Sequence, residues 1–379
     1  MHETYRYLIM AIDPVHVGTG GMRLGRVDNT IVREPGTNLP KIPGTALHGA
    51  IRAYAARRFG KIQCAGQKGH CGQDTCPICY TFGSISGQES YSGVISITDA
   101  RILLFPVYSM VGPVWVSTVD ILQEAGFQVQ QNGNKVSGAG PFATFEQEQP
   151  LNLGWLMIEK PTKVTITDRS EDTSTQNKKT VWLSLPEPTR NRVILVSDKL
   201  FSQIVNSNLE VRTSVAINPE TGAAEEGALY SYEAIPRATI LWFDVIVDDF
   251  RNEFPDRKKW EEISNNYPGT NGLPDTIPDN ELNEEKLLRK LGYIGERPEN
   301  SEKKNEYWNK VKSSFSNFKE VMEKLSWENP IDIVNFGIEW LPHLGLGGMG
   351  TRGFGRVEEL VYFKFKTVDF KSCEEKENE

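Results

Sequence analysis

The sequence predicts an α+β protein with a ferredoxin-like core, on three observations. Residues 5–13 mix alternating positions with β-branched and aromatic side chains and end at Asp13-Pro14, as a strand does. Apolar residues then recur at helical spacing over residues 46–59. Two strand-like stretches and a second helix follow, and this order builds a small open sheet with helices on one face.

The first 125 residues supply most of this core. Glycines at residues 18–21 make a flexible turn after the first strand. The other predicted elements here are, in chain order, an exposed hairpin or edge over 26–34, a helix over 46–59 with Thr45 as its N-cap, strands over 93–106 and 111–117, and a helix over 118–125.

Beyond residue 125 the predicted elements are shorter. Residues 212–233 are polar and contain glycine, and they predict a protruding hairpin, or thumb. The remaining elements are, in chain order, strands over 163–167 and 179–185, a strand leading into a helix over 191–206, a strand over 239–248, helices over 280–291 and 301–325, a strand or helix edge over 331–340, and a final strand over 357–365.

These elements divide the chain into a core and four additions. The core takes residues 1–125, 239–248 and 331–366. The additions are a cysteine-bearing insertion over 61–82, a thumb and lid region over 126–238, a helical insertion over 249–330, and a charged tail over 367–379.

Composition indicates a soluble, cytoplasmic protein without a membrane anchor. Of 379 residues, 39% are hydrophobic and 24% charged, and no run of eighteen apolar residues occurs. The net charge is -8, yet residues 1–61 carry nine cations against four anions. A basic N-terminal face would hold a polyanion in one groove; scattered, solvated charge is the plainer alternative.

Four of the five cysteines follow a C-x6-C-x4-C-x2-C spacing that suits a metal ion. They are Cys64, Cys71, Cys76 and Cys79, with His70 beside them as a spare ligand. Four thiolates match the tetrahedral preference of zinc, and a closed site of this kind is structural because no position stays open for catalysis. Free buried thiols or a redox pair are the alternatives.

A second glycine-rich loop, residues 343–356, carries Arg352 and Arg356. Cations among closely approaching backbone N–H groups suit phosphate. The dinucleotide fingerprint and the triphosphate P-loop are both missing, so a nucleic acid fits better than a nucleotide. On the exposed face of the helix over 46–59, His48, Arg52 and Arg57 extend this basic character.

Asp28 and His16 are the acid and base candidates near this surface. Asp28 would hold a hard metal ion or assist a ribose hydroxyl, and His16 would transfer a proton. The alternative for Asp28 is a turn or capping residue, and for His16 a packed side chain without a catalytic role.

Several motifs together resemble a known family. They are HVGTG at 16–20, the stretch 26–34, KIPGTAL at 41–47 and TDARILLFPV at 98–107. They resemble the repeated backbone subunit of type III-B CRISPR effectors, which belongs to the RAMP superfamily. The segment GGMGTRGFGRV near the C-terminus is similar to the glycine-rich loop of RAMP proteins in general.

The resemblance implies a modified RNA-recognition-motif core with a thumb, in a subunit that polymerises along a guide RNA beside other effector subunits. It implies cleavage of complementary target RNA with magnesium or another divalent ion. Asp28 matches the family's cleaving acid and His16 its accessory histidine. Glu226, Tyr230 and Glu233 are the possible equivalents of its thumb residues.

The same resemblance implies that the guide RNA (crRNA) runs along the first helix and the second glycine-rich loop. The contacts it implies come from His48, Arg52, Arg57, Gly347, Gly348, Arg352, Gly353 and Arg356. His48 stands where the family commonly has lysine, and the cysteine and helical insertions are further departures. A non-catalytic RNA-binding scaffold is the main alternative; a guide-processing ribonuclease and a zinc hydrolase rank lower.

Overall fold

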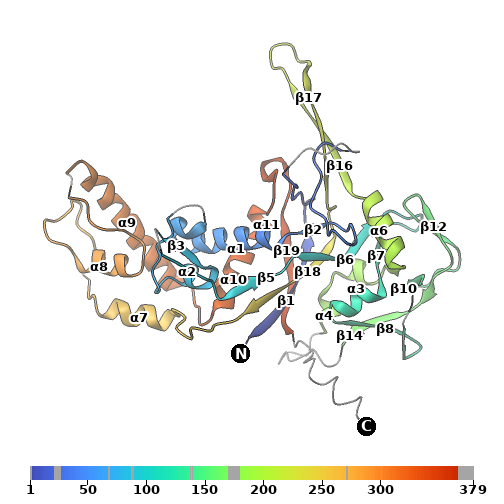
Figure 1. Cartoon of the computed structure of the whole chain (residues 1–379), viewed down its shortest axis with the longest axis horizontal. Coiled ribbons are helices and arrows are strands. Elements are labelled where there is room, and N and C mark those ends of the chain that lie inside the picture. The colour runs from blue at the N-terminus through green and yellow to red at the C-terminus, as the bar shows by residue number, and fades with distance from the viewer. Residues whose placement is uncertain are drawn as a thin grey trace, which may run out of the picture. The chain divides into compact units, whose positions relative to one another are not determined.

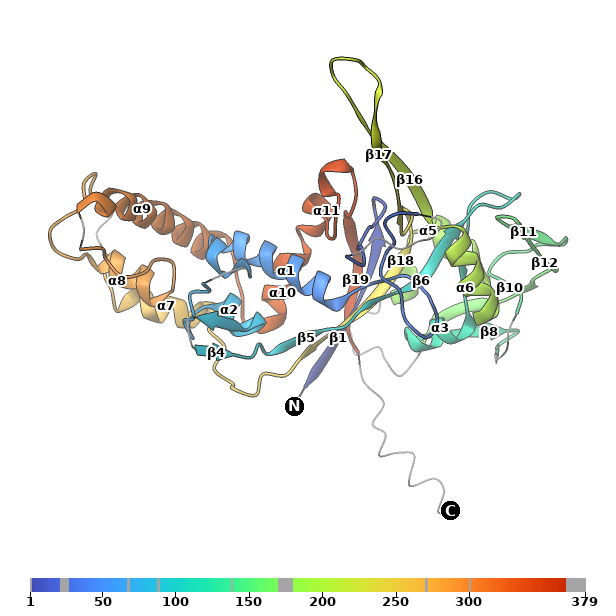
Figure 2. The same ribbon diagram turned by 45° about the horizontal axis from the view of Figure 1, so that its top comes forward.

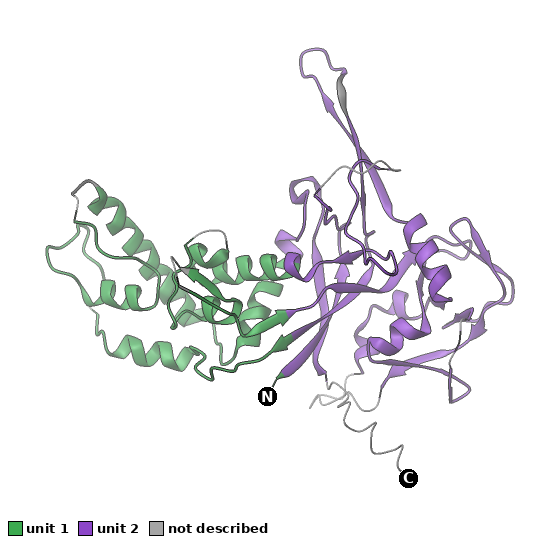
Figure 3. Ribbon diagram, viewed as in Figure 1, with its two compact units in different colours: residues 1–2, 47–96, 246–341 green, residues 3–46, 97–245, 342–379 purple. Residues whose placement is uncertain are grey.

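The computed structural model describes residues 2–20, 27–66, 69–86, 89–136, 138, 140–169, 180–269, 272–299 and 301–365 (Figures 1 and 2). The charged tail predicted over 367–379 lies outside these ranges, as does the start of the stretch 26–34. The chain forms two compact units (Figure 3). Unit 1 contains mainly Leu47–Ser96 and Ile246–Leu341, and unit 2 contains Glu3–Ala46, Ile97–Val245 and Pro342–Glu379.

Unit 2 is built on a large mixed sheet in which the first and last strands of the chain are neighbours. Antiparallel pairing of β1 and β19 runs from Thr4 opposite Phe365 to Ala11 opposite Val357. The strand order is β13 (Thr162–Lys163), β10 (Phe142–Ala143), β15 (Val193–Leu195), β7 (Val114–Ser117), β6 (Ala100–Val107), β18 (Ile240–Val247), β1 (Glu3–Ala11) and β19 (Val357–Phe365), with β2 (Lys41–Ile42) paired to β6.

Short elements cover this sheet and enclose a core that includes Leu104, Phe127 and Trp242. Thr118 caps α3, because its hydroxyl accepts a hydrogen bond from the Ile121 amide at 3.1 Å. The elements are α3 (Val119–Glu124), β8 (Phe127–Gln131), β9 (Asn134–Lys135), β11 (Leu151–Leu153), β12 (Leu156–Ile158), β14 (Thr165–Asp168), α4 (Val181–Ser184), α5 (Glu187–Arg190), α6 (Asp198–Ser207), α11 (Leu341–Leu344) and the 3-10 turn η2 (Gly350–Arg352).

A long antiparallel hairpin, β16 (Glu210–Ile217) and β17 (Ala224–Ala234), extends from unit 2 away from the sheet (Figures 1 and 2). Its exposed apolar residues are Val211, Val215, Ile217 and Leu229. The base of the hairpin lies beside residues 28–31, where Asn29 forms a parallel bridge with Tyr232. The hairpin predicted over residues 212–233 is therefore confirmed as a secondary-structure element.

Unit 1 is mostly helical and has an aromatic core. Phe59, Trp260 and Trp327 pack with their ring centroids 5.1–6.1 Å apart. Its elements are α1 (Gly44–Arg58), which begins in unit 2, η1 (Ile62–Ala65), α2 (Pro77–Phe82), β3 (Ser84–Ser86), β4 (Glu89–Tyr91), β5 (Ile95–Ile97), α7 (Arg257–Asn265), α8 (Asn283–Lys290), α9 (Ser301–Lys324) and α10 (Pro330–Ile338). In the described ranges, no helix is both long and apolar enough to span a membrane.

The predicted α+β class is confirmed, but the sheet is larger than the small open sheet that the sequence predicts, and two local predictions are wrong. The first helix begins at Gly44, so Thr45 lies in its first turn and is not the N-cap. Residues 181–184, predicted to be in a strand, form α4, since the Asp168 carboxylate accepts from the Trp182 amide at 2.8 Å. The helix α7 was not predicted; Asp256 caps it, because its carboxylate accepts from the Lys259 amide at 2.8 Å.

Candidate functional site

Asp28 is an exposed carboxylate at the base of the β16–β17 hairpin. Its Oδ2 accepts hydrogen bonds from the Ser231 amide at 2.7 Å and from the Ser231 hydroxyl at 2.9 Å. The Asp28 amide donates in turn to the Ser231 Oγ at 3.2 Å. The bond from the Ser231 amide, followed by the bond from its hydroxyl, lowers the pKa of Asp28 below the ordinary value. The carboxylate is therefore ionised at neutral pH.

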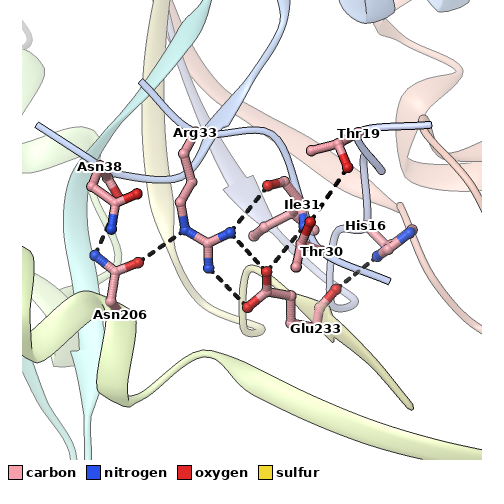
Figure 4. A network of polar contacts seen from close by, with 8 residues as sticks. All are labelled: His16, Thr19, Thr30, Ile31, Arg33, Asn38, Asn206 and Glu233. Carbon is pink, nitrogen blue, oxygen red and sulfur yellow. Dashed lines mark hydrogen bonds and ion pairs between the residues drawn. The ribbon is translucent and has the colours of Figure 1, made fainter. Parts of the chain in front are cut away.

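A partly buried ion pair fixes the segment that carries Asp28 to the same strand. Glu233 accepts from the Arg33 guanidinium at 2.7 and 2.8 Å and from the Ile31 amide at 3.1 Å (Figure 4). Arg33 also donates to the Asn206 side chain of α6 at 3.0 Å. Such two-pronged pairs set geometry as well as energy, so this network positions residues 28–33 against β17.

His16 is buried, and its ring contacts other parts of the protein rather than solvent. Its Nδ1 lies 2.7 Å from the backbone oxygen of Glu233 (Figure 4). Its backbone carbonyl accepts from the Gly348 amide at 2.8 Å. Gly347 has a φ of +78°, and a Cβ there would lie 2.5 Å from the same carbonyl. The second glycine-rich loop therefore packs on His16 at a distance that only glycine permits.

This packing corrects the expectation that the loop offers free amides to a phosphate. The Gly348 amide donates to His16 and the Gly353 amide to the Gly350 carbonyl at 3.2 Å. The Gly355 amide donates to the Pro14 carbonyl at 2.9 Å. These three amides therefore serve contacts within the protein, and the RNA contacts of Gly347, Gly348 and Gly353 stay a prediction.

Exposed arginines gather at the base of the hairpin. Arg352 donates to the Tyr230 hydroxyl, and Arg356 forms a two-pronged pair with Asp13 at 2.5 and 3.0 Å. The bond from Arg356 lowers the pKa of Asp13, and the charges of Arg237 and Arg212 contribute. Arg212 and Arg237 were missed in the sequence, because only the fold brings them to Asp13. Glu226 lies in β17, but its side chain is outside the described part.

In unit 1 the cations expected on the first helix have different environments. Arg52 is buried and donates to the backbone oxygens of Cys64 at 2.8 Å and Phe82 at 3.3 Å, so the expectation of an exposed cation is wrong there. His48 packs edge-on against Phe82, and burial lowers its pKa, which leaves it neutral at pH 7. Arg57 is exposed, as expected.

The four predicted cysteines converge in unit 1. Their sulfur atoms all lie within 4.8 Å of one another, with Cys64 3.9 Å from Cys76 and Cys71 3.7 Å from Cys79. Sulfurs bound tetrahedrally to zinc at about 2.3 Å lie about 3.8 Å apart, so the donor set fits that metal. His70 is not in the cluster; its Nδ1 accepts from the Ile85 amide at 2.9 Å.

Sequence reasoning did not identify three residues at these two sites. Ser231 holds Asp28, Arg33 holds Glu233, and the fully buried Lys61 accepts at its backbone carbonyl from the Cys64 amide at 2.8 Å. For the first two pairs the partners are about 200 positions apart, so no local pattern reveals them. For Lys61 the one signal in the sequence is its place three residues before Cys64.

Comparison with known proteins places these features in a family context. The model of the RAMP superfamily matches residues 8–358. The "CRISPR system Cmr endoribonuclease Cmr4" of Pyrococcus furiosus is 26% identical over 258 residues, which cover 65% of this chain and 82% of that protein. The "CRISPR system Cms endoribonuclease Csm3" of Methanothermobacter thermautotrophicus is 28% identical over 32% of this chain and 53% of that protein.

The chain also aligns with chains of solved structures at low identity. A chain of the apo type III-B Cmr-beta complex aligns with a TM-score of 0.48 and 15% identity, covering 65% of this chain and 85% of that one. A chain of oligomeric Cmr4 from Pyrococcus furiosus aligns with a TM-score of 0.41 and 18% identity, covering 71% and 90%.

Proposed function

The chain belongs to the RAMP superfamily, and on that premise we propose that it is the repeated backbone subunit of a type III CRISPR effector. In this proposal the subunit binds guide RNA, assembles with copies of itself and other effector subunits, and cleaves complementary target RNA at Asp28. The observation that carries the proposal is the exposed, ionised Asp28 carboxylate, held by Ser231 at the base of a protruding hairpin. The names of the relatives, which are endoribonucleases, support it.

Cleavage requires that a target nucleotide leave the helical stack. The β16–β17 hairpin, with its exposed apolar residues, would act as the thumb that displaces one nucleotide of the target. The 2'-hydroxyl would then align with the adjacent phosphorus, the O2'–P bond would form as the hydroxyl proton passes to water, and the P–O5' bond would break as the leaving oxygen takes a proton from water. The products would be a 2',3'-cyclic phosphate and a 5'-hydroxyl.

Asp28 suits orientation and charge rather than strong base catalysis. A carboxylate with a lowered pKa is a weak base but a lasting anion, so it would accept a hydrogen bond from the attacking hydroxyl. Magnesium or another divalent ion would be held by Asp28 together with RNA phosphate oxygens, and it would supply charge stabilisation. In the described residues the four cysteines make the only cluster of three or more metal-ligating side chains, so Asp28 does not belong to such a cluster.

His16 and Glu233 would position the site, and Tyr230 would orient Arg352. The His16 ring is buried on the Glu233 backbone, and Glu233 binds Arg33 and the Ile31 amide, so neither is placed to transfer a proton to solvent-exposed RNA. Tyr230 accepts from Arg352 and would lie near a displaced nucleotide.

Guide RNA would bind through phosphates, since base pairing to the target supplies the sequence specificity. The exposed cations Arg57, Arg352, Arg237 and Arg212 are the contacts that the side-chain environments favour. In the same proposal residues 1–125, 239–248 and 331–366 make the RNA-recognition-like core, residues 126–238 the thumb and lid region, and residues 249–330 a helical insertion. Residues 61–82 would bind structural zinc.

A complementary target RNA tests the cleavage. The assembled complex is incubated with end-labelled target, with and without magnesium. Regularly spaced fragments that end in a 2',3'-cyclic phosphate support the proposal. Intact RNA that stays bound would support the second candidate.

The second candidate is a non-catalytic RNA-binding scaffold of the same kind of complex. One observation favours it: the Asp28 carboxylate already accepts two hydrogen bonds from Ser231, as a structural brace would. The variant Ser231→Ala separates the two functions. If Asp28 has only a structural role, the variant should have a more mobile hairpin base and should bind the same amount of RNA. If Asp28 is catalytic, the variant should also cleave the target RNA more slowly.

A further inference from the structure

The fully buried Lys61 points to a second use of the cysteine cluster. Its Nζ lies 4.7 Å from the ring centre of Tyr293 and 5.9 Å from that of Trp260. Among the described residues, no carboxylate forms an ion pair with it. A buried ammonium without a counter-charge is unfavourable, so some other negative group must compensate it.

The cysteines are the groups that fill this role. The Cys64 amide donates to the Lys61 carbonyl at 2.8 Å, and the Lys61 Nζ donates to the carbonyl of Leu291, whose neighbour Gly292 packs against the Cys71 sulfur. Four thiolates around one divalent ion carry two net negative charges. One buried ammonium beside them halves that excess and makes the closed site less costly to bury.

Lys61 also caps the C-terminal end of α8, a helix of the helical insertion. It donates to the Leu291 carbonyl, Thr75 donates to the Lys290 carbonyl at 2.6 Å, and Gln63 donates to the Gly292 carbonyl at 2.9 Å. Three successive carbonyls at the C-terminal end of α8 are therefore satisfied by side chains of the cysteine segment. Cations are favoured at this end because the unpaired carbonyls make it negative.

The same turn approaches the metal ligands directly. Gly292 has a φ of +73°, and a Cβ there would lie 2.8 Å from the sulfur of Cys71. Trp260 of α7 donates to the Thr75 carbonyl at 2.8 Å, and the Tyr293 hydroxyl donates to the Phe59 carbonyl at 2.9 Å. The cysteine segment thus contacts both α7 and the end of α8.

We propose that metal binding at the four cysteines fastens the helical insertion to the cysteine segment, with Lys61 as the buried counter-cation that links them. This inference rests on the proposed zinc site. Lys61 is a positioning residue: it shares the charge of the thiolates and holds the end of α8 through the Leu291 carbonyl. Loss of the metal removes the ion that holds the four sulfurs together, so the turn at Gly292, which packs on the Cys71 sulfur, loses its anchor.

The test measures zinc affinity and amide exchange on the full chain. A chelator competition gives the zinc affinity of the wild type, Lys61→Met and Lys61→Gln, with the exposed Lys258→Met as a matched control. Hydrogen exchange of the amides of residues 290–293 is followed with and without zinc. Glutamine keeps a donor for the Leu291 carbonyl without the charge, so it separates the two contributions and guards against misfolding of the methionine variant.

The expected result is one zinc per wild-type chain and exchange at residues 290–293 that becomes at least tenfold faster when zinc is removed. Both Lys61 variants should bind zinc about 10–100-fold more weakly, as loss of a partner around a metal site does, while Lys258→Met matches the wild type. Wild-type zinc affinity in both Lys61 variants, or exchange that zinc does not change, overturns the inference and leaves the zinc site intact. A wild-type chain that binds no zinc overturns both this inference and the proposed zinc site. If that chain still cleaves target RNA, the proposal for Asp28 stands independently of the zinc site.

Discussion

Replacing Glu233 with glutamine should loosen the segment that carries Asp28. The carboxylate makes two bonds to the Arg33 guanidinium, at 2.7 and 2.8 Å, and one to the Ile31 amide at 3.1 Å. Glutamine keeps one oxygen but turns an N–H donor toward a guanidinium donor. One charge-assisted bond is therefore lost, and its ordinary contribution is about 1.5–3 kcal/mol.

The partial exposure of Arg33, the partner of Glu233, reduces the free energy that this hydrogen bond contributes. The Arg33 side chain is 21% exposed, and the guanidinium keeps its bonds to the Asn206 side chain and the Ile31 carbonyl. The expected net loss is about 2 kcal/mol, which corresponds to a factor of about 30 in the local opening equilibrium.

Hydrogen exchange over residues 29–34 measures this opening. The Glu233→Gln protein should exchange about 30-fold faster there than the wild type, at the same pH and temperature. Glu146→Gln is the matched control, because the pair of Glu146 with Lys163 lies in the same unit but is exposed on both sides, and it should leave the segment unchanged. Equal exchange in Glu233→Gln and the wild type would refute the positioning role given to this ion pair.

Three other outcomes follow from the same contacts. Hydrogen bonds from Ser231 lower the pKa of Asp28, so the contact between the two residues is present above the ordinary carboxyl pKa of about 3.9. It is lost only as the pH falls through the lowered pKa. Exchange of the Ser231 amide that becomes faster between about pH 7 and pH 5, after correction for intrinsic rates, would contradict this. Arg52→Met should destabilise unit 1 by about 2 kcal/mol in urea unfolding and leave guide-RNA affinity unchanged, because the guanidinium binds two buried carbonyls; weaker RNA binding at full stability would count against it. Arg57→Gln should weaken guide-RNA binding and lower the slope of log affinity against log salt concentration by about 0.7. Arg58→Gln should have a smaller effect, because Arg58 is already paired with Glu339 at 3.4 Å. Equal losses of affinity in the two variants would contradict this difference.

Local periodicity predicted the strands and helices whose neighbours in sequence decide their structure. Residues 357–365 were predicted as a strand and form β19 over the same range, since alternation is a local property. The spacing of the four cysteines likewise predicted their convergence, because two of them, Cys76 and Cys79, lie on one turn around the start of α2.

Environment decided what periodicity could not. Arg52 lies on a helix whose pattern favours exposure, but the cysteine segment covers it and its guanidinium binds the Cys64 carbonyl. Glycines in residues 343–356 suggested an anion cradle, yet the same flexibility lets Gly347 approach the His16 carbonyl. A glycine-rich composition is compatible with both an anion site and a tightly packed loop, so it does not distinguish them.

The pairing of Asp28 with Ser231 is a tertiary contact between residues 203 positions apart. A single sequence gives no register for such a contact, so the thumb residues could be named but not aligned with Asp28. The family resemblance supplied the candidate acid, and the fold supplied the residue that holds it.

The central claim is that Asp28 cuts the target RNA, and one measurement tests it most directly. The complex is assembled with guide RNA and either wild-type chain or Asp28→Ala, and labelled complementary RNA is followed for binding and for fragments in magnesium. The proposed function predicts equal binding and no fragments from Asp28→Ala. Normal fragments from a well-assembled Asp28→Ala complex would contradict it.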